Sequence, residues 1–377
     1  MLRTMSAVPA PIEPTMPTGP WVLVVGMHRS GTSAVTGALG HLGLAVPRSE
    51  DRYAYYGPTE DNPEHWESRA MGSHDDALLE RLGGTWDRPP ACEPGWESDP
   101  GLAIDDLGDP AAAASVAFSN DGPIAWKDPR VCLLLPHWLA HLPKPVTAVF
   151  IWRSPLSVAR SLQARDRLHL ADGVALWERY NRSGLSGLVG VDTFVTRYES
   201  IVEDPLGRLR TLANWLGDLP QFAAHAPQWD LASAAASISP QLLRQSPSDD
   251  SDLLLDEQRE LVEHLETLEG PHNPLTSLSL RAESQWTTAL IGDRQELSAL
   301  SLQRDSVRRT LAEHKIRAQI SAAEIEGLKR QLEGAREELA AMHELYERMQ
   351  GSTSWRITRP LRQAAGLRVR SSPKPRP

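Results

Sequence analysis

The stretch VLVVGMHRSGTSAVTGALGHLGL, residues 22–44, puts an apolar run, a loop bounded by glycines and a helix-forming segment in direct succession. The run at 21–25 contains three valines and no charge, which is typical of a buried parallel strand. Gly26 and Gly31 have the spacing of a phosphate-binding loop, in which backbone N–H groups at a helix N-terminus attract an anion. A Walker loop continues with lysine, but Thr32 stands at that position. The stretch therefore predicts an α/β fold with an anion site that lacks the Walker lysine.

The side chains of this loop add hydroxyl groups and one cation. Ser30, Thr32 and Ser33 supply hydroxyl donors, whereas Arg29 carries its charge three residues before the position of the Walker lysine. In an NTPase the lysine spans the β- and γ-phosphates, and the hydroxyl that follows it holds magnesium. The shifted cation instead suits a cofactor that rests one 5′-phosphate on the loop and has no γ-phosphate to transfer.

A second strand-helix unit is found in VTAVFIWRSPLSVARSLQAR, residues 146–165. Its apolar first part predicts a strand, Ser154 is a capping residue, and Pro155 suits the first helical turn. Arg153 ends the strand and Ser161 lies two turns into the helix. A ligand that crosses the carboxyl ends of adjacent strands would meet both units, as at the switch point of an open α/β sheet.

Strand and helix patterns alternate through most of the first 280 residues. Short strands are expected at 124–126 and 192–200, and an amphipathic helix is expected at 205–217. Helices are also expected at 34–44, 77–82, 133–142, 174–185 and 253–268, and the segment 89–123 is expected to be mostly loop or insertion. These patterns predict a P-loop-like three-layer α/β sandwich, in which helices cover both faces of a central parallel sheet.

Two motifs together resemble those of the PAPS-dependent sulfotransferase family, where PAPS is 3′-phosphoadenosine 5′-phosphosulfate. GMHRSGTS, residues 26–33, is similar to the family's 5′-phosphosulfate loop, and Arg153, Pro155 and Ser161 match its R-x-P-x-x-x-x-x-S pattern position by position. The family holds the 3′-phosphate of PAPS with that arginine and serine. The resemblance, which covers residues 21–217, implies PAPS as the sulfuryl donor and no metal requirement.

Three further places resemble bacterial members that sulfate carbohydrates or related metabolites. DNPEHWES, residues 61–68, is similar to the family's N-P-x-G-x-W-E segment, although His65 replaces the usual glycine or its neighbour. WKDPR, residues 126–130, stands in the expected order, and Tyr198 matches the tyrosine that approaches the adenine. The resemblance implies transfer to a hydroxyl of a carbohydrate, glycolipid or related acceptor.

Sulfuryl transfer to a hydroxyl needs a base for the acceptor proton and positive groups at the bridging oxygen of the departing nucleotide. Arg29 and the loop amides are expected to supply the positive groups at this bridging oxygen. The resemblance places a glutamate near the acceptor, so Glu67 is the expected base. His65 is the alternative, because the ordinary pKa of a histidine suits a base better than that of a glutamate.

Lys127, Asp128 and Arg130 form a charged group directly after the expected strand at 124–126. They are expected to line the acceptor side or to contact the sulfonate. The alternative is a salt-bridged strand end that only orders the site.

Cysteine content and charge limit the remaining functions. Cys92 and Cys132 are far apart and belong to no C-x-x-C motif, so neither a disulfide framework nor a zinc site is expected, and the default location is a reducing cytoplasm. The chain has a net charge of −10, but residues 351–377 carry +7 and the rest −17. An acidic body argues against nucleic-acid binding. The chain also has no apolar run long enough to span a membrane, so at most peripheral contact is expected.

The C-terminal part changes character at about residue 282. Apolar residues recur there at alternating spacings of three and four, which predicts a heptad seam: Ile325, Leu328, Leu332, Ala335, Leu339, Met342, Tyr346 and Met349. The seam continues less purely back to Leu311. It predicts self-association or a partner helix through 311–349, and the alternative is a single amphipathic helix on the main domain.

The expected organisation is a disordered lead at 1–20, a sulfotransferase domain at 21–280, a coiled coil at 283–350 and a basic tail at 351–377. The tail mixes Trp355 and other apolar residues with arginines, so 351–370 either lies on the inner face of an anionic membrane or is a solvated tail. Two other functions remain: a P-loop kinase or NTPase, and a non-catalytic scaffold built on the coil.

Overall fold

The computed structural model describes residues 15–52, 66–92, 95–99, 107–119, 122–239, 253–277 and 279–362. The chain divides into two compact units, Met1–Leu297 and Ser298–Pro377. No helix of the described residues is long and apolar enough to cross a membrane.

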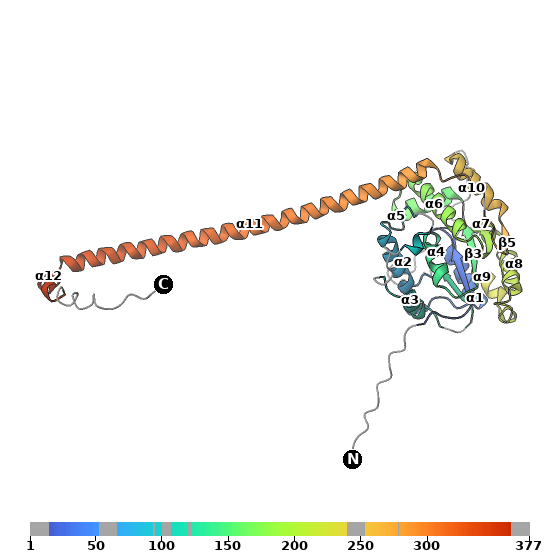
Figure 1. Ribbon diagram of the computed structural model, residues 1–377, viewed down its shortest axis with the longest axis horizontal. Coiled ribbons are helices and arrows are strands. Elements are labelled where there is room, and N and C mark those ends of the chain that lie inside the picture. The colour runs from blue at the N-terminus through green and yellow to red at the C-terminus, as the bar shows by residue number, and fades with distance from the viewer. Residues whose placement is uncertain are drawn as a thin grey trace, which may run out of the picture. The chain divides into compact units, whose positions relative to one another are not determined.

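A five-stranded sheet in the order β2-β1-β3-β4-β5 forms the centre of the first unit (Figure 1). The first four strands pair in parallel, and β5 pairs antiparallel with β4 at the edge. The strands are β1 (Trp21–Val25), β2 (Ile124–Lys127), β3 (Val146–Trp152), β4 (Asp192–Arg197) and β5 (Gly270–His272). The predicted parallel sheet is confirmed, with an antiparallel edge strand that the sequence patterns did not indicate.

Helices cover both faces of this sheet because its central strands are apolar on both sides. Trp21, Leu23 and Val25 of β1 pack into one core, whereas Val22 and Val24 pack into the other. The first core contains side chains of α2 (Arg69–Arg81), α3 (Pro110–Ala117), α4 (Val131–His141), α5 (Pro155–Asp166), α6 (Leu170–Gly187) and α10 (Asp256–Thr267). The second contains side chains of α1 (Thr32–Leu42), α7 (Tyr198–Glu203), α8 (Pro205–Asp218) and α9 (Leu231–Ala236). The predicted three-layer sandwich is therefore confirmed.

Two elements of the first half differ from the expectation. The segment 89–123, expected to be mostly loop, contains α3, which begins after Asp109 because that carboxylate accepts a hydrogen bond from Ala111 N at 2.8 Å. The helix expected at 77–82 begins earlier, at Arg69, because the Ser68 hydroxyl accepts from Met71 N at 3.1 Å. Short 3-10 turns occur at Ser49–Asp51, Trp96–Ser98 and Ala226–Gln228.

The strand order creates a switch point between β1 and β3. The chain leaves β1 for β2 on one side of it, and then returns to add β3 on the other side. In open α/β sheets, ligands bind outside the carboxyl ends of the strands at such a point. The loop at 26–31 and the turn at Arg153 follow these two strands at that edge of the sheet.

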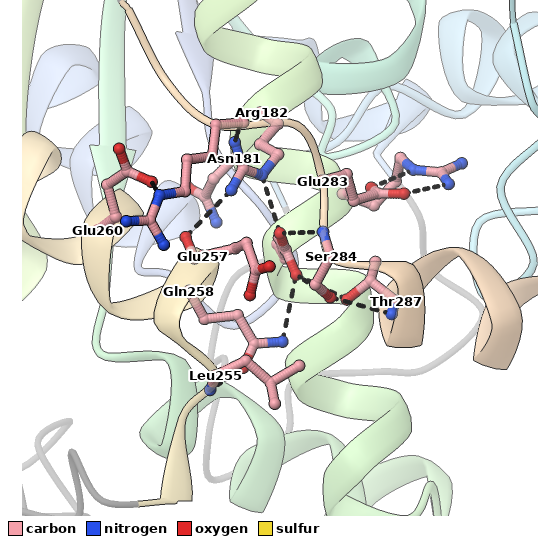
Figure 2. A network of polar contacts seen from close by, with 12 residues as sticks. Asn181, Arg182, Leu255, Glu257, Gln258, Glu260, Glu283, Ser284 and Thr287 are labelled. Carbon is pink, nitrogen blue, oxygen red and sulfur yellow. Dashed lines mark hydrogen bonds and ion pairs between the residues drawn. The ribbon is translucent and has the colours of Figure 1, made fainter.

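The buried carboxylate of Glu178 in α6 fixes the first turn of α11 (Gln285–Gly351). Figure 2 labels its partners Arg182, Gln258, Ser284 and Thr287. Glu178 accepts hydrogen bonds from Ser284 N at 2.9 Å and from the Thr287 hydroxyl at 2.7 Å. Arg182 pairs with it at 2.9 Å, and Gln258 donates to it at 3.2 Å. Burial raises the pKa of Glu178, but the bonds from Thr287 and Ser284 and the charge of Arg182 outweigh burial and hold the pKa below its ordinary value.

The second unit consists of the rest of α11 and a short helix, α12 (Thr353–Ile357). This confirms the predicted long C-terminal helix. All residues of 298–351 are described, and none of them is buried. The Arg362 guanidinium lies over the Trp355 ring, 3.4 Å from its centre. Residues 363–377, the larger part of the predicted basic tail, and residues 1–14 of the predicted lead lie outside the described residues.

Candidate functional site

The backbone of the loop at 26–31 follows a path that its two glycines allow. A Cβ atom at Gly26 would lie 2.3 Å from the carbonyl oxygen of Ile151 on the neighbouring strand. Gly31 has a φ of 89°, and a Cβ there would lie 2.1 Å from the Tyr198 ring. Arg29 also has a left-handed backbone, with a φ of 67°. This non-glycine residue in the left-handed region turns the loop amides at the start of α1.

The N-terminus of α1 has no side-chain cap. Gly31 precedes the helix and cannot supply a capping side chain. The first N–H groups of α1 therefore need hydrogen-bond acceptors from the backbone or from a ligand. Ser30 is fully buried, and its hydroxyl has no hydrogen-bond partner among the described residues. Since a buried polar group without a partner is costly, the Ser30 hydroxyl points to a bound ligand.

The loop after β1 and the helix after β3 are brought together by Arg29. Its Nε donates to the Ser161 hydroxyl at 2.7 Å, although the two residues are 132 positions apart. Arg153 Nη1 in turn donates to the carbonyl oxygen of Arg29 at 3.3 Å. The three residues that the sequence assigned to the two ends of a nucleotide thus form one contact group.

Arg153 is held in place by its surroundings but keeps an unused donor. It is 7% exposed, its Nε lies 3.9 Å from a Glu199 carboxylate oxygen, and its guanidinium lies 5.4 Å from the centre of the Tyr198 ring. Trp177 Nε1 donates to the Arg153 carbonyl at 2.9 Å and fixes the backbone. Within the described residues, Arg153 Nε makes no hydrogen bond, so the fork has capacity for an anion.

Tyr198 begins α7 and forms one wall beside the loop, because its ring packs against Gly31. It is buried, and burial raises the pKa of its hydroxyl, while the nearby Arg153 charge acts in the opposite direction. The tyrosine therefore stays neutral at physiological pH. A neutral aromatic ring beside the phosphate loop suits the predicted contact with a purine base.

Lys127 places a cation beside Thr32. The lysine ends β2 and is 2% exposed, and its Nζ lies 3.4 Å from the Thr32 hydroxyl. The Arg29 side chain instead lies against Ser161. A lysine from the neighbouring strand thus stands beside the residue that replaces the Walker lysine. The role expected for Arg29, at the bridging oxygen of the nucleotide, stays a prediction; in the structure its side chain contacts Ser161 of α5.

Glu67 contacts Lys127 through a direct ion pair between its carboxylate and Nζ. The expected base and the expected substrate cation are therefore in direct contact. His65, the alternative base, lies outside the described residues, as do the first residues of the segment 61–68.

Asp128 and Arg130 are engaged with each other. Arg130 Nε and Nη2 donate to the two Asp128 oxygens at 2.8 and 2.6 Å, and a further ion pair joins Arg130 to Asp76 at 2.5 Å. This bidentate pair follows β2 directly and starts α4. It has the form of a salt-bridged strand end, which was the alternative to a direct role of these two residues on the acceptor side.

Three residues that the sequence analysis did not select belong to the same surroundings. Ser157 lies one helical turn before Ser161, is buried, and has a hydroxyl without a hydrogen-bond partner among the described residues. Glu199 contacts Arg153, as described above. His28 lies in the loop itself, with its ring 4.8 Å from the Trp86 ring. The repeated serines of RSPLSVARS were a usable signal for Ser157.

His28 is kept neutral by its environment. Burial lowers the pKa of its imidazole well below the ordinary value, and the charges of Arg165, Arg130, Lys127 and Arg29 lower it further. The loop histidine therefore adds no positive charge of its own to the site.

Comparison with other proteins gives structural neighbours only. No protein-family model matches the chain, and no curated protein is significantly similar in sequence. The sulfotransferase domain from the curacin biosynthetic pathway is 17% identical, with a TM-score of 0.33 over 73% of this chain and 97% of that chain. The sulfotransferase domain of the Synechococcus PCC 7002 olefin synthase is 17% identical, with a TM-score of 0.34 over 75% and 96%. A sulfotransferase from Mycobacterium tuberculosis H37Rv is 14% identical, with a TM-score of 0.35 over 62% and 78%. The chain is thus similar to solved sulfotransferase domains at low identity, and its function has to be inferred from its own side chains.

Proposed function

We propose that this protein is a PAPS-dependent sulfotransferase that moves a sulfuryl group to a hydroxyl of a carbohydrate, glycolipid or related acceptor. The observation that carries the proposal is the contact group of Arg29, Arg153 and Ser161 at the switch point. It joins a 5′-phosphate loop to a second anion-binding group at the end of the adjacent strand. A nucleotide with phosphates at both its 3′ and 5′ positions fits such a pair of sites.

The buried polar atoms support the fit of this nucleotide. Ser30 Oγ, Ser157 Oγ and Arg153 Nε are buried and make no hydrogen bond within the described part of the chain. They lie in the loop after β1 and around the end of β3, which are the two places that would hold the 5′- and 3′-phosphates. PAPS supplies the activated sulfuryl group when it is bound. Tyr198 is assigned to the adenine and the loop amides to the 5′-phosphate.

Lys127 and Glu67 are assigned the chemical roles. The ammonium group of Lys127, beside Thr32, stabilises the negative charge that develops on the departing nucleotide side. Glu67 accepts the proton of the acceptor hydroxyl, and its ion pair with Lys127 holds the two groups together until the acceptor enters. Arg29 is assigned to the 3′-phosphate with Arg153 and Ser161, because its side chain lies on that side.

The acceptor class rests on the sequence of segment 61–68 and its resemblance to bacterial carbohydrate sulfotransferases. Both cysteines are free, which suits a reducing compartment, so we assign the protein to the cytoplasm.

Lys127 also favours a second candidate, a P-loop kinase or NTPase. A lysine near the loop hydroxyl is what such an enzyme needs, and here β2 supplies it. This candidate requires ATP and magnesium, whereas the sulfotransferase requires neither.

Calorimetric titration with 3′-phosphoadenosine 5′-phosphate and, separately, with ATP and magnesium tests the proposal. We expect binding of the first nucleotide without metal, and an affinity loss of about 10- to 100-fold in Arg153→Ala, the range for a lost charged hydrogen bond. Arg210→Ala, an exposed arginine of α8, is the control and should bind as the wild type does. Binding of ATP alone would support the kinase or NTPase. Binding of neither nucleotide would contradict both enzymes and favour a non-catalytic scaffold built on the coiled coil.

A second variant separates catalysis from binding. Glu67→Gln keeps the size of the side chain but removes the proton acceptor, so it should abolish transfer while leaving nucleotide affinity near the wild-type value. Normal turnover in this variant would remove Glu67 from the role of base.

A further inference from the structure

The part of α11 in the second unit exposes an apolar seam that is unbroken over 325–349. Exposed fractions range from 43% to 65% at the large apolar seam positions, which are Leu311, Ile325, Leu328, Leu332, Leu339, Met342, Tyr346 and Met349. Their spacing assigns Ile325, Leu332, Leu339 and Tyr346 to heptad position a, and Leu328, Ala335, Met342 and Met349 to position d. A soluble helix rarely leaves such a stripe uncovered, because burying one large apolar side chain stabilises by about 1.5–3 kcal/mol.

Two glycines on the outer face of this helix lower its stability as a single helix. Gly327 and Gly334 both occupy heptad position c, and nothing lies within 4 Å of a Cβ atom built on either of them. Glycine in a helix interior costs about 1 kcal/mol relative to alanine. The segment 298–351 therefore contains two unfavourable residues on one side and an uncovered apolar seam on the other, and pairing offsets the cost.

The charges beside the seam favour one partner and one direction. Position g carries Glu324 and Glu338, and position e carries Lys329, Arg336 and His343. In a parallel pair of identical helices, each g residue faces the e residue five positions later on the partner. Glu324 then faces Lys329, and Glu338 faces His343. In an antiparallel pair g faces g and e faces e, so acids approach acids and bases approach bases.

We propose that residues 311–349 form a parallel, in-register two-stranded coiled coil with the same residues of a second copy of this chain. Two strands are favoured over three or four because larger bundles bury the e and g positions, and this helix carries Glu324 and Glu338 at g and Lys329 and Arg336 at e. The seam is purest over 325–349, which therefore forms the centre of the interface. This pairing is independent of the proposed enzymatic activity, since it uses no residue of the first unit.

Mass and cross-linking of the full chain test the proposal. Analytical ultracentrifugation should give a dimer at micromolar concentration. Met342→Cys at position d should form a disulfide-linked dimer under mild oxidation, because the two copies of a d residue meet in a parallel pair. Ala341→Cys, one residue earlier on the outer face, is the matched control and should not cross-link more than the wild type. Residue 342 lies well away from the middle of 311–349, so an antiparallel pair would not bring its two copies together.

Charge reversal tests the direction a second time without changing the apolar seam. Glu324→Lys places like charges at the interface of a parallel pair and should raise the dimer dissociation constant by about 2- to 5-fold, the range for one exposed charge pair. Adding Lys329→Glu should restore it. A monomer, a trimer or tetramer, or the absence of a Met342→Cys cross-link in a dimer would each overturn the proposal. An unchanged dissociation constant in both charge variants would overturn the parallel direction.

Discussion

One helix, α11, runs through two regions that obtain their stability in different ways. Around residues 284–295 the helix belongs to the first unit: Thr287 and Ile291 are buried, and Ser284 and Thr287 both bond to Glu178. Arg294 adds ion pairs to Asp172 at 3.0 Å and Asp87 at 2.9 Å. From residue 298 to 351 no side chain is buried, and apolar residues are exposed along the seam.

The difference teaches that continuous helical structure does not imply a common source of stability. The first region is stabilised by contacts within the chain, whereas the second exposes apolar side chains of the kind that are buried in an interface between helices. Perturbations of the first unit should therefore affect folding and chemistry and leave self-association intact, and perturbations of the distal helix should do the reverse.

The largest expected effect comes from Lys127. Lys127→Ala should lower kcat/KM by about 10²- to 10³-fold, as expected when one preorganised charge donor is removed from a transition state. The dimer mass should not change, because the residue lies in β2. Release of 3′-phosphoadenosine 5′-phosphate measures the rate, and the exposed Lys144→Ala is the control. A loss of less than about threefold would assign the charge-stabilising role to another residue.

The next effect concerns the anchor of α11. Glu178→Ala should lower the free energy of unfolding of the first unit by about 3 kcal/mol, because it leaves Arg182 and four donor groups without their buried partner. Urea unfolding followed by tryptophan fluorescence measures the change. Glu203→Ala, an exposed carboxylate of α7, is the control. An unchanged urea midpoint would mean that the contacts of Glu178 do not stabilise the start of α11. Loss of the dimer in this variant would mean that the two regions of α11 are not stabilised independently.

A third effect is a dependence of stability on pH that belongs to the first unit only. His74 and His137 are buried and share a hydrogen bond of 3.0 Å between their Nε2 atoms. Burial lowers the pKa of His137 to about 3, with further lowering by the charges of His141 and His74, and burial also lowers the pKa of His74. These pKa values lie below that of unfolded histidine, so stability is complete above about pH 6.5 and falls as the pH decreases.

Between pH 6.5 and pH 5 the loss from His137 should be about 2 kcal/mol, from 1.36 kcal/mol per pH unit. His137→Gln should reduce this slope, and the exposed His169→Gln should not. Chemical denaturation at several pH values measures it. The same slope in both variants would place the titrating group elsewhere.

The smallest effect compares two glycines of α11. Gly292 lies in the first region and Gly327 in the second, and a Cβ atom meets nothing within 4 Å at either position. Substitution of either glycine by alanine should stabilise its own region by up to about 1 kcal/mol. Hydrogen exchange should slow near 292 in one variant and near 327 in the other. Slower exchange at both places in a single variant would show that the two regions unfold together.

The central elements were predictable because local patterns decide them. Apolar runs without charge indicate buried parallel strands, and glycine or proline marks their ends, so β1, β3, α1 and α5 could be expected from residues 21–44 and 146–165. The strand β5 could not, because Gly270–His272 is three residues long and contains no apolar alternation. The helix α3 carried a readable signal, Asp109 followed by Pro110 and alanines, within a segment rich in loop-forming residues.

The contacts among the candidate residues were less predictable than their selection. Arg29, Arg153, Ser161 and Tyr198 lie close together, and their roles stay predictions. The place of Lys127 depends on the pairing of β1 with β2, which links residues about a hundred positions apart and leaves no local trace. The direction of Arg29 depends on its left-handed backbone, which residue type alone does not reveal. Self-association through 311–349 and the basic tail stay predictions.

The hydrogen bond between Arg29 and Ser161 also has a consequence for how the protein can be assayed. It joins parts of the chain that meet only after the long-range pairing of β1 with β3, so the two groups that we propose as phosphate-binding do not exist together in the unfolded chain. A ligand held by both groups would bind the folded state alone, and its occupancy would add to the free energy of unfolding by mass action. The melting temperature of the first unit is thus a test of the proposed nucleotide binding that needs no knowledge of the acceptor.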